Sequence, residues 1–275
     1  MCTLVIAWDV FDGAPVVVAA NRDEATDRPS TPPARRGESP AVVAPRDERA
    51  GGTWIGYNDA GVFVGLSNRW AGGDLEGERS RGLLVADALE REDAATAVRW
   101  VEDALAAVEY APFNLVVADA DAAILLEWDG HLSVTEFEPG VHVLTNAGYD
   151  DTFYAVPERP EAAAAQAESA ARVRTALAPE TGESPEAWLD RAADVLGDHD
   201  YGVCVHGAVS ERRSDGQPDA DASGGGYGTK SSSLIAIRAD GTATFRFADG
   251  PPCVAPFEPV EASGLDADRA AEGQS

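Results

Sequence analysis

The order of strand-like and helix-like segments is the feature that most limits how this chain can fold. Short apolar runs with strand character fill residues 2–68, two helical patterns follow, strands resume, a second helical pair appears, and strands close the pattern. A sheet must bury its apolar face against another layer, and the two helical pairs supply outer layers. The sequence therefore predicts an α+β fold, a four-layer αββα sandwich of two mainly antiparallel sheets flanked by helices.

Two kinds of strand are expected. Turn signals such as "FDGA" and "DAG" between the early runs indicate an antiparallel meander, with one broad loop over 25–49 that is rich in Pro, Arg and Asp. The runs 113–119 and 122–128 are almost continuously apolar, so we expect them to be buried on both faces. The expected strands are 2–10, 15–21, 41–47, 53–59, 61–68, 113–119, 122–128, 141–147, 202–207, 232–239 and 242–248.

Four helices are expected from apolar spacing and capping signals. The first covers 82–90, and the second, 93–108, repeats valine and leucine at helical spacing. A proline opens an alanine-rich helix over 160–177. The last, 184–197, has a serine as its N-cap, a proline as its first helical residue and a glycine as its stop.

One domain, 1–260, is expected because the sequence shows no internal repeat and no linker rich enough to divide it. The segment 209–228 has the composition of a flexible low-complexity loop. Residues 261–275 are expected to form an acidic, flexible tail.

The charge balance is strongly acidic. Forty-eight Asp and Glu face 21 Lys and Arg, for a formal net charge of −27, and Lys230 is the only lysine. Salt screens such self-repulsion, so the composition indicates a halophilic protein in a high-salt cytoplasm. An acidic surface made for a basic partner is the weaker alternative, because the acidic residues are spread along the whole chain. Nucleic acid is excluded as a partner, since no cluster of basic residues can neutralise phosphates.

The N-terminal segment and the cysteines indicate a reducing compartment. The first 25 residues lack a basic region, and Asp9 and Asp12 interrupt the apolar run, so neither a signal peptide nor stable membrane insertion is expected. Cys2, Cys204 and Cys253 are too few for a disulfide framework, and no pair has zinc-ligand spacing. We expect a cytoplasmic protein with reduced thiols, no metal and no cofactor; the sequence does not indicate an oligomeric state.

Cys2 is the first candidate for chemistry. If Met1 is removed, its thiol shares one residue with a free α-amino group, whose reference pKa of roughly 8 suits proton transfer. Nucleophile and base then reside in one residue. The competing interpretation is that Cys2 packs as a small apolar side chain.

The "ANRDE" segment ends the second expected strand with four polar residues. On a pleated strand Arg22 and Glu24 face opposite to Asn21 and Asp23, and a hairpin with the first strand places them beside Cys2. An arginine there lowers the pKa of the thiol, and a carboxylate holds the ammonium in place. A surface salt-bridge cluster is the alternative.

Asparagines at strand ends are the next candidates. Asn68 and Asn146 each close a strand, and such side-chain amides can stabilise an oxyanion, an interaction worth about 3 kcal/mol in acyl transfer. Turn formation explains either asparagine equally well. Trp54 follows a Gly-Gly pair, and Lys230 stands with three serines in "YGTKSSS".

Together the segments "ANRDE", "GGTWIGYN", "SRGLL", "FNLVVAD", "LTNA" and "YGTKSS", with Cys2, resemble the NRDE-motif family, whose eukaryotic members are called transport-and-Golgi-organisation proteins. The resemblance runs from Cys2 to Phe247. That family is in turn similar to the N-terminal nucleophile (Ntn) hydrolases of the cholylglycine hydrolase and penicillin acylase branch, in which a cysteine exposed by processing cleaves amides within an αββα sandwich.

The resemblance implies a role for each matching residue. Cys2 is the nucleophile and, through its amine, the base; Arg22 and Asp23 orient and activate it; Asn68 and Asn146 stabilise the tetrahedral oxyanion. The candidate substrate-binding residues are Asn21, Glu24, Trp54, Arg69 and Lys230, the last standing where the family pattern has arginine.

Three functions remain open from the sequence. The first is an Ntn-type cysteine amidohydrolase or acyltransferase that acts on a small acylated molecule through a thioester on Cys2. The second is a non-catalytic protein that binds and carries haem, acyl-CoA or lipid in the same cleft, although the four histidines stand singly along the chain. The third is a scaffold with a degenerate site.

Overall fold

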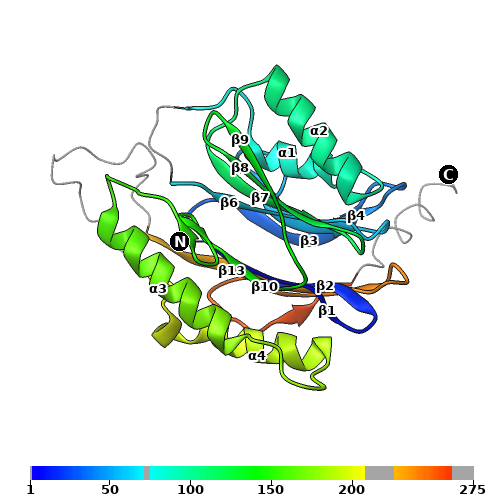
Figure 1. The fold of residues 1–275 in the computed structure, drawn as a ribbon, viewed down its shortest axis with the longest axis vertical. Helices are drawn as coiled ribbons and strands as arrows, with labels where there is room; N and C mark the ends of the chain where they lie inside the picture. The colour runs from blue at the N-terminus through cyan, green and yellow to red at the C-terminus, as the bar shows by residue number, and fades with distance from the viewer. Residues whose placement is uncertain (1, 71–74, 208–225, 262–275) are drawn as a thin grey trace, which may run out of the picture.

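Two antiparallel sheets lie face to face with helices on both outer sides, as Figure 1 shows. The computed structural model describes residues 2–70, 75–207 and 226–261. The predicted four-layer αββα sandwich is confirmed, and every strand pair in the described residues is antiparallel. The predicted loop 209–228 and tail 261–275 lie almost entirely outside the described residues.

The first sheet has the strand order β12-β11-β10-β1-β2-β13-β14-β15. Its central strands come from the beginning and the end of the chain, because β2 pairs with β1 on one side and with β13 on the other. The strands are β1 Thr3–Phe11, β2 Ala14–Ala25, β10 Gly140–Leu144, β11 Gly148–Tyr149, β12 Thr152–Phe153, β13 Tyr227–Ile237, β14 Ala243–Ala248 and β15 Glu258–Pro259.

The second sheet is a continuous meander in the order β3-β4-β5-β6-β7-β8-β9. The early strands therefore divide between the two sheets, and the chain crosses from one sheet to the other after β2. The strands are β3 Ser30–Arg36, β4 Val42–Asp47, β5 Ile55–Asn58, β6 Phe63–Asn68, β7 Phe113–Ala118, β8 Ala123–Trp128 and β9 Leu132–Glu136.

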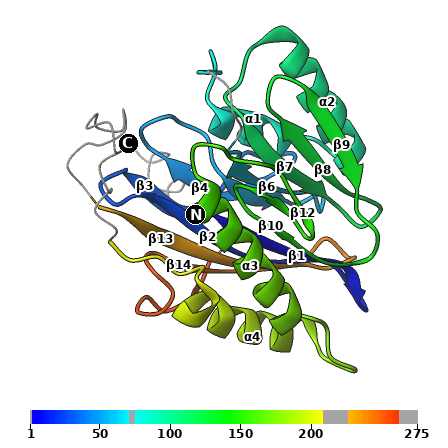
Figure 2. The same cartoon turned by 60° about the vertical axis from the view of Figure 1, so that its left-hand side comes forward.

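The helices cover the two outer faces (Figure 2). Helices α1 Arg81–Ala88 and α2 Ala94–Ala107 pack on the second sheet, while α3 Pro160–Ala176 and α4 Pro185–Gly197 pack on the first. All four agree closely with the predicted ranges. The predicted cap of α4 is confirmed, because the Ser184 hydroxyl accepts a hydrogen bond from the Ala187 amide.

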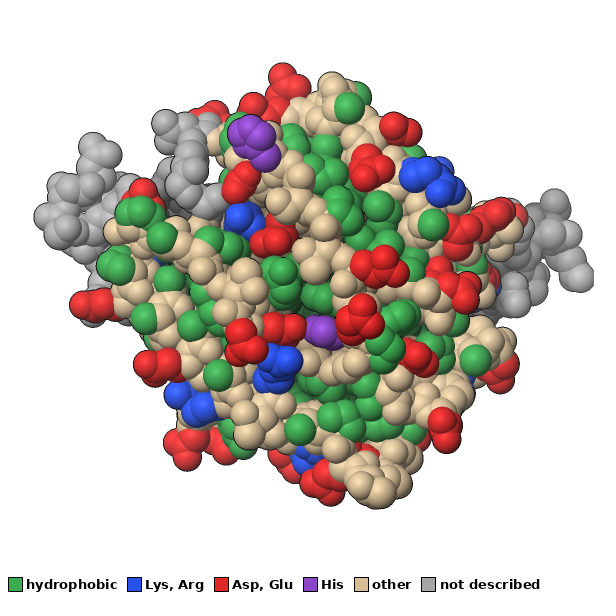
Figure 3. Space-filling model, in the orientation of Figure 1, with side chains coloured by type: hydrophobic (Ala, Val, Ile, Leu, Met, Phe, Trp, Pro, Cys, Tyr) green, Lys and Arg blue, Asp and Glu red, His purple; other side chains and the backbone are tan. Residues whose placement is uncertain are grey.

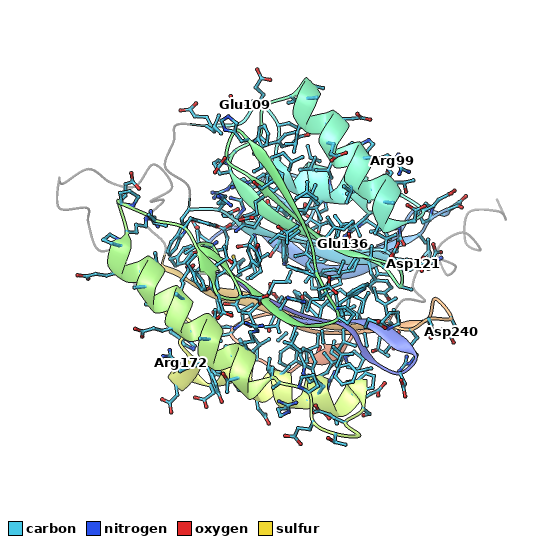
Figure 4. All side chains as sticks on the ribbon, in the orientation of Figure 1. Arg99, Glu109, Asp121, Glu136, Arg172 and Asp240 are labelled. Atoms are coloured by element: carbon cyan, nitrogen blue, oxygen red, sulfur yellow. The ribbon has the colours of Figure 1, made fainter. Side chains whose placement is uncertain are left out.

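Three apolar clusters follow from this layering, and Figure 4 shows side chains filling the space between the sheets. One cluster lies between the sheets and contains Leu4, Ile6, Val18 and Ala20. The other two lie beneath the helical pairs. The β7 strand is buried along its whole length, as its continuous apolar run predicts.

Several segments differ from the sequence-based prediction, among them the strands β9, β11, β12 and β15, which were not expected. Part of the expected loop 25–49 is β3, an edge strand whose register shifts between Thr31 and Ala34, where two prolines stand. Proline is compatible with an edge strand and a bulge because the missing N–H leaves no ladder bond unmade. The run 202–207 forms no strand: Gly202 is left-handed, with φ of 71°, and the chain turns there instead of extending.

The face of the molecule drawn in Figure 3 is acidic, and its acidic side chains do not gather in one patch. Figure 3 shows Asp and Glu side chains spread over the whole visible face, with few basic side chains among them. Within the described residues, no helix is both long enough and apolar enough to cross a bilayer.

The buried Trp188 of α4 gives the fold a direct test. Its side chain is fully buried in the cluster beneath α3 and α4, and its Nε1 donates to the Leu177 carbonyl at 2.9 Å. We expect Trp188→Ala to lower the free energy of unfolding by about 3–5 kcal/mol through the lost packing and the cavity left behind. Urea denaturation measures this. Val134→Ala, at a half-exposed position, serves as the control and should change it by less than about 1 kcal/mol; equal effects would contradict the assigned core.

Candidate active site

Cys2 and Arg22 lie next to each other at the same end of the first sheet. The β1–β2 register pairs Thr3 with Asn21, and side chains alternate between the faces of a strand. Leu4 and Ala20 belong to the cluster between the sheets, so Cys2 and Arg22, two residues further toward this end of their strands, share that inner face. The predicted hairpin thus brings the "NRDE" strand beside Cys2.

The backbone nitrogen of Cys2 is held by Asn146. It donates to the Asn146 Oδ1 at 2.9 Å, and that same oxygen accepts from Gln166 Nε2 of α3 at 3.1 Å. The Asn146 Nδ2 donates to the Asn68 carbonyl at 2.6 Å and to Ser67 Oγ at 3.1 Å. All polar atoms of the Asn146 amide are therefore engaged, which fixes its orientation and with it the position of the Cys2 nitrogen.

The Cys2 thiol lies against Asp23. Its Sγ donates to the Asp23 carbonyl at 3.6 Å. The Asp23 carboxylate accepts from Thr229 Oγ1 at 2.6 Å, and Thr229 in turn donates through its backbone N–H to the Val205 carbonyl. Burial raises the pKa of the Asp23 carboxyl above its ordinary value, and the Thr229 hydrogen bond opposes that rise.

Arg22 belongs to a buried cluster of charges between the sheets. Its Nη2 lies 3.1 Å from Asp47 Oδ2 and 3.6 Å from Glu24 Oε2, and Arg28 Nε reaches the same Asp47 oxygen at 2.6 Å. The guanidinium stacks over the Trp54 ring, 4.0 Å from its centroid. Among the described residues, the Arg22 Nη1 atom is buried without a hydrogen-bond partner, so it is free to donate to a ligand oxygen.

Opposing effects set the protonation of these groups. Burial raises the pKa of the Cys2 thiol, the Asp23 charge adds to the rise, and the Arg22 charge lowers it; the net direction is upward. Burial also raises the pKa of Asp47, but hydrogen bonds from Arg28 and the Ala50 amide outweigh it and leave that pKa below its ordinary value. The cluster thus keeps Asp47 ionised and the resting Cys2 thiol neutral, so the thiol needs a base.

A cavity of about 180 Å³ opens at these residues. Its wall includes Cys2, Arg22, Trp54 and Asn68. The Gly-Gly turn and the start of α1 form another part of the wall, through Gly51 and Gly82. The two segments touch at Gly52, which has φ of 73° and where a Cβ would lie 2.1 Å from the Gly82 carbonyl oxygen. Only glycine permits this approach of the turn to the start of α1.

The structure brings together most of the sequence-predicted site residues. Those that line the cavity or contact its lining are Cys2, Asn21, Arg22, Asp23, Glu24, Trp54, Asn68 and Asn146. Asn68 contributes its carbonyl to Asn146, and it is an exposed residue of the cavity wall.

Three predicted substrate-binding residues are placed differently. Asn21 belongs to the cavity wall, but its side chain lies on the opposite face of β2, where its Nδ2 donates to the Leu196 and Val203 carbonyls. Arg69 is paired away from the cavity with Glu127 and Asp129 and stacks on Tyr154. The Lys230 Nζ donates to the Thr26 carbonyl, and none of these contacts reaches the cavity. Each of these side chains is engaged by the fold instead of facing a ligand.

Sequence reasoning missed three residues that shape the site. Asp47, at the end of the expected strand 41–47, was not a candidate site residue, yet it pairs with Arg22 across the two sheets. Gln166 is 2 % exposed in the alanine-rich helix α3, where it is the residue that turns toward Asn146. Thr229, in the "YGTKSSS" segment, precedes the predicted residue Lys230 and is the one that donates a hydrogen bond to the Asp23 carboxylate.

The comparisons with solved structures define the class of fold. The chain is similar to penicillin V acylase from Agrobacterium tumefaciens, with a TM-score of 0.51 and 15% identity over 92% of this chain and 93% of that one. A mutant of the conjugated bile acid hydrolase from Clostridium perfringens gives 0.53 and 12% over 95% and 97%. The N-acylethanolamine-hydrolyzing acid amidase ortholog of Caenorhabditis elegans gives 0.51 and 13% over 87% and 93%. The architecture is that of the Ntn hydrolases.

The family follows from the sequence match. The chain belongs to the family described as Transport and Golgi organisation 2, whose model matches residues 1–247. The predicted resemblance to the NRDE-motif family is thereby confirmed. Comparison with curated proteins finds no match.

The position of Arg22 beside Cys2 predicts a change in thiol reactivity. Because the Arg22 charge lowers the pKa of Cys2, Arg22→Gln should raise that pKa further and slow alkylation at neutral pH by several-fold. The rate of iodoacetamide labelling of the Cys2 peptide, followed by mass spectrometry from pH 6 to pH 10, measures the shift. Arg69→Gln, an arginine paired elsewhere, should leave the profile unchanged. An unchanged profile in Arg22→Gln would refute the electrostatic coupling.

Proposed function

We propose that this protein is an Ntn-type cysteine amidohydrolase or acyltransferase that acts on a small acylated molecule through a thioester on Cys2. The observation that carries the proposal is the position of Cys2 in the cavity wall. Its nitrogen is hydrogen-bonded to Asn146 Oδ1 and its sulfur to the Asp23 carbonyl. Removal of Met1 turns that nitrogen into an α-amine, the base that the neutral thiol lacks.

The proposed reaction follows from these positions. The α-amine of Cys2 takes the thiol proton, and the thiolate attacks the acyl carbonyl carbon to form a tetrahedral intermediate with a new C–S bond. The C–N bond then breaks, the leaving amine takes the proton from the α-ammonium, and the acyl group remains as a thioester. Water releases it as a carboxylic acid, or a second amine or alcohol accepts it.

Each neighbouring group has a part in this scheme. The Asn146 Oδ1, oriented by Gln166, accepts a hydrogen bond from the α-amine. This contact orients the amine so that its nitrogen lone pair can take the thiol proton. The Arg22 charge stabilises the developing thiolate. Asp23, held by Thr229, favours the ammonium form of the amine. The exposed Asn68 side chain is the candidate donor to the oxyanion.

The cavity and the comparisons support a small acylated substrate. A volume of about 180 Å³ is below the roughly 300–1,000 Å³ of pockets that enclose drug-sized ligands, so it suits the reacting carbonyl and a short part of the substrate. The similar structures bear the names of an acylase, a hydrolase and an amidase. Arg22 Nη1 offers a donor for a substrate oxygen.

The alternative of a haem or acyl-CoA carrier has less support from the same cavity. Its volume is small for either ligand. The four histidines are all among the described residues, and none of them lines this cavity. A haem carrier that uses this cavity would therefore need an axial ligand other than histidine.

Substitution of the nucleophile tests the proposal. Processed protein should release amine from members of a panel of N-acyl amides with short acyl groups, and Cys2→Ala should lower the rate by at least about a thousandfold because no thioester can form. The thermal unfolding midpoint of Cys2→Ala should match that of the native protein, which shows that the fold is retained. Turnover that persists in a folded Cys2→Ala would refute the mechanism.

A further inference from the structure

A second cluster of reactive side chains lies outside the cavity, near the end of α4. His199 stands in the 3-10 turn after α4, Cys204 and His206 follow it, and Cys253 comes from the turn after β14. One ligand atom from each of the four lies within 4.8 Å of the others. None of the four lines the Cys2 cavity, so this cluster is a separate site.

The distances in the cluster suit a tetrahedral metal ion. Zinc bonds of about 2.3 Å to sulfur and 2.0–2.1 Å to nitrogen place two sulfur ligands about 3.8 Å apart, and a sulfur and a nitrogen about 3.6 Å apart. The Cys204 and Cys253 sulfurs are 3.6 Å apart, and His206 Nε2 is 3.6 Å from Cys204 Sγ and 2.8 Å from Cys253 Sγ. To hold a metal, the exposed His206 ring must move away from Cys253 Sγ by about 0.8 Å, from 2.8 Å to the roughly 3.6 Å of a tetrahedral site.

The fold holds the three chain segments of this cluster together. Gly197 ends α4 directly against the Cys253 turn, since a Cβ there would lie in van der Waals contact, 3.4 Å from the Cys253 amide nitrogen. The Val203 carbonyl accepts from Asn21, and Val205 exchanges backbone and side-chain hydrogen bonds with Thr229. The ligands are thus anchored on both sides of the cluster.

The ligand types distinguish a metal site from a disulfide. The Cys204–Cys253 sulfur distance of 3.6 Å is well beyond the roughly 2.05 Å of a bond. A disulfide also gives no reason for two histidine rings to converge on the same point, and His199 and His206 lie with ring centroids 5.0 Å apart. Two thiolates with two imidazoles are the donor set of a structural zinc ion.

We propose that His199, Cys204, His206 and Cys253 bind one Zn²⁺ ion in a closed, structural site. Both thiols lose their protons on binding, and the two imidazoles bind as neutral rings. With four protein ligands no position stays open for a substrate, so the ion joins the end of α4 to the turn after β14. It also steadies Val205, which bonds to Thr229, the residue that holds Asp23.

Metal binding by the reduced full-length protein tests this site. After treatment with a chelator and a thiol reductant, the protein should take up one Zn²⁺ per chain, measured by elemental analysis after dialysis. Co²⁺ in place of zinc should give the visible absorption of a tetrahedral ion and a thiolate-to-cobalt band. Cys253→Ser and His206→Asn should each weaken binding by at least roughly tenfold, whereas Cys2→Ala and His131→Asn, which alter a cysteine and a histidine outside the cluster, should bind as the native protein does.

Three results would overturn the proposal. One is a reduced, folded protein that binds neither ion at 1:1; another is an unchanged affinity in both ligand variants. The third is loss of binding in Cys2→Ala with retention in Cys253→Ser. Because His206 is exposed, His206→Asn keeps the test valid if a cysteine variant fails to fold.

Discussion

The hydrogen bonds of the Asn146 side chain are the interaction on which the site depends. Its oxygen accepts from the nitrogen of Cys2, the residue before β1 of the first sheet, and its nitrogen donates to the Asn68 carbonyl and Ser67 hydroxyl of β6 in the second. One amide thus joins the two sheets at the point where the cavity opens. Loss of this side chain would leave buried polar partners on both sheets unsatisfied, at a cost of about 1–3 kcal/mol for each group. The position of Cys2 is therefore a consequence of how the sheets are stacked.

A second connection between the sheets is electrostatic. Arg22 from β2 meets Asp47 from β4, and Arg28 and Glu24 complete a set of two positive and two negative side chains. Truncation of one member would leave a partly buried charge without its partner. The cluster therefore contributes more to the fixed position of Arg22 than to the net stability of the fold. It places one guanidinium close enough to the thiol to favour its thiolate, in a protein whose net charge of −27 otherwise opposes negative charge.

The sequence predicted local structure well because local signals determine it. Helix limits followed from apolar spacing and caps, as at Ser184, and the expected hairpin of the first two strands placed the "NRDE" strand beside Cys2. Contacts between distant segments were not predictable. Asp47 joins Arg22 only when two sheets stack, and Cys204 meets Cys253, 49 residues away, only after α4 and the turn after β14 come together. Arg69 and Lys230 were predicted to bind substrate, yet Arg69 forms an ion pair with an acidic side chain and Lys230 donates to a backbone carbonyl.

The intact mass of the native protein, before and after treatment with a small cysteine-directed acylating probe, tests the central claim most directly. If Cys2 supplies both thiol and amine, the protein lacks Met1 and gains one acyl group that maps to Cys2, and Cys2→Ala gains none. Retention of Met1, or an adduct that persists in Cys2→Ala, would contradict the account, because the thiol would then lack its base.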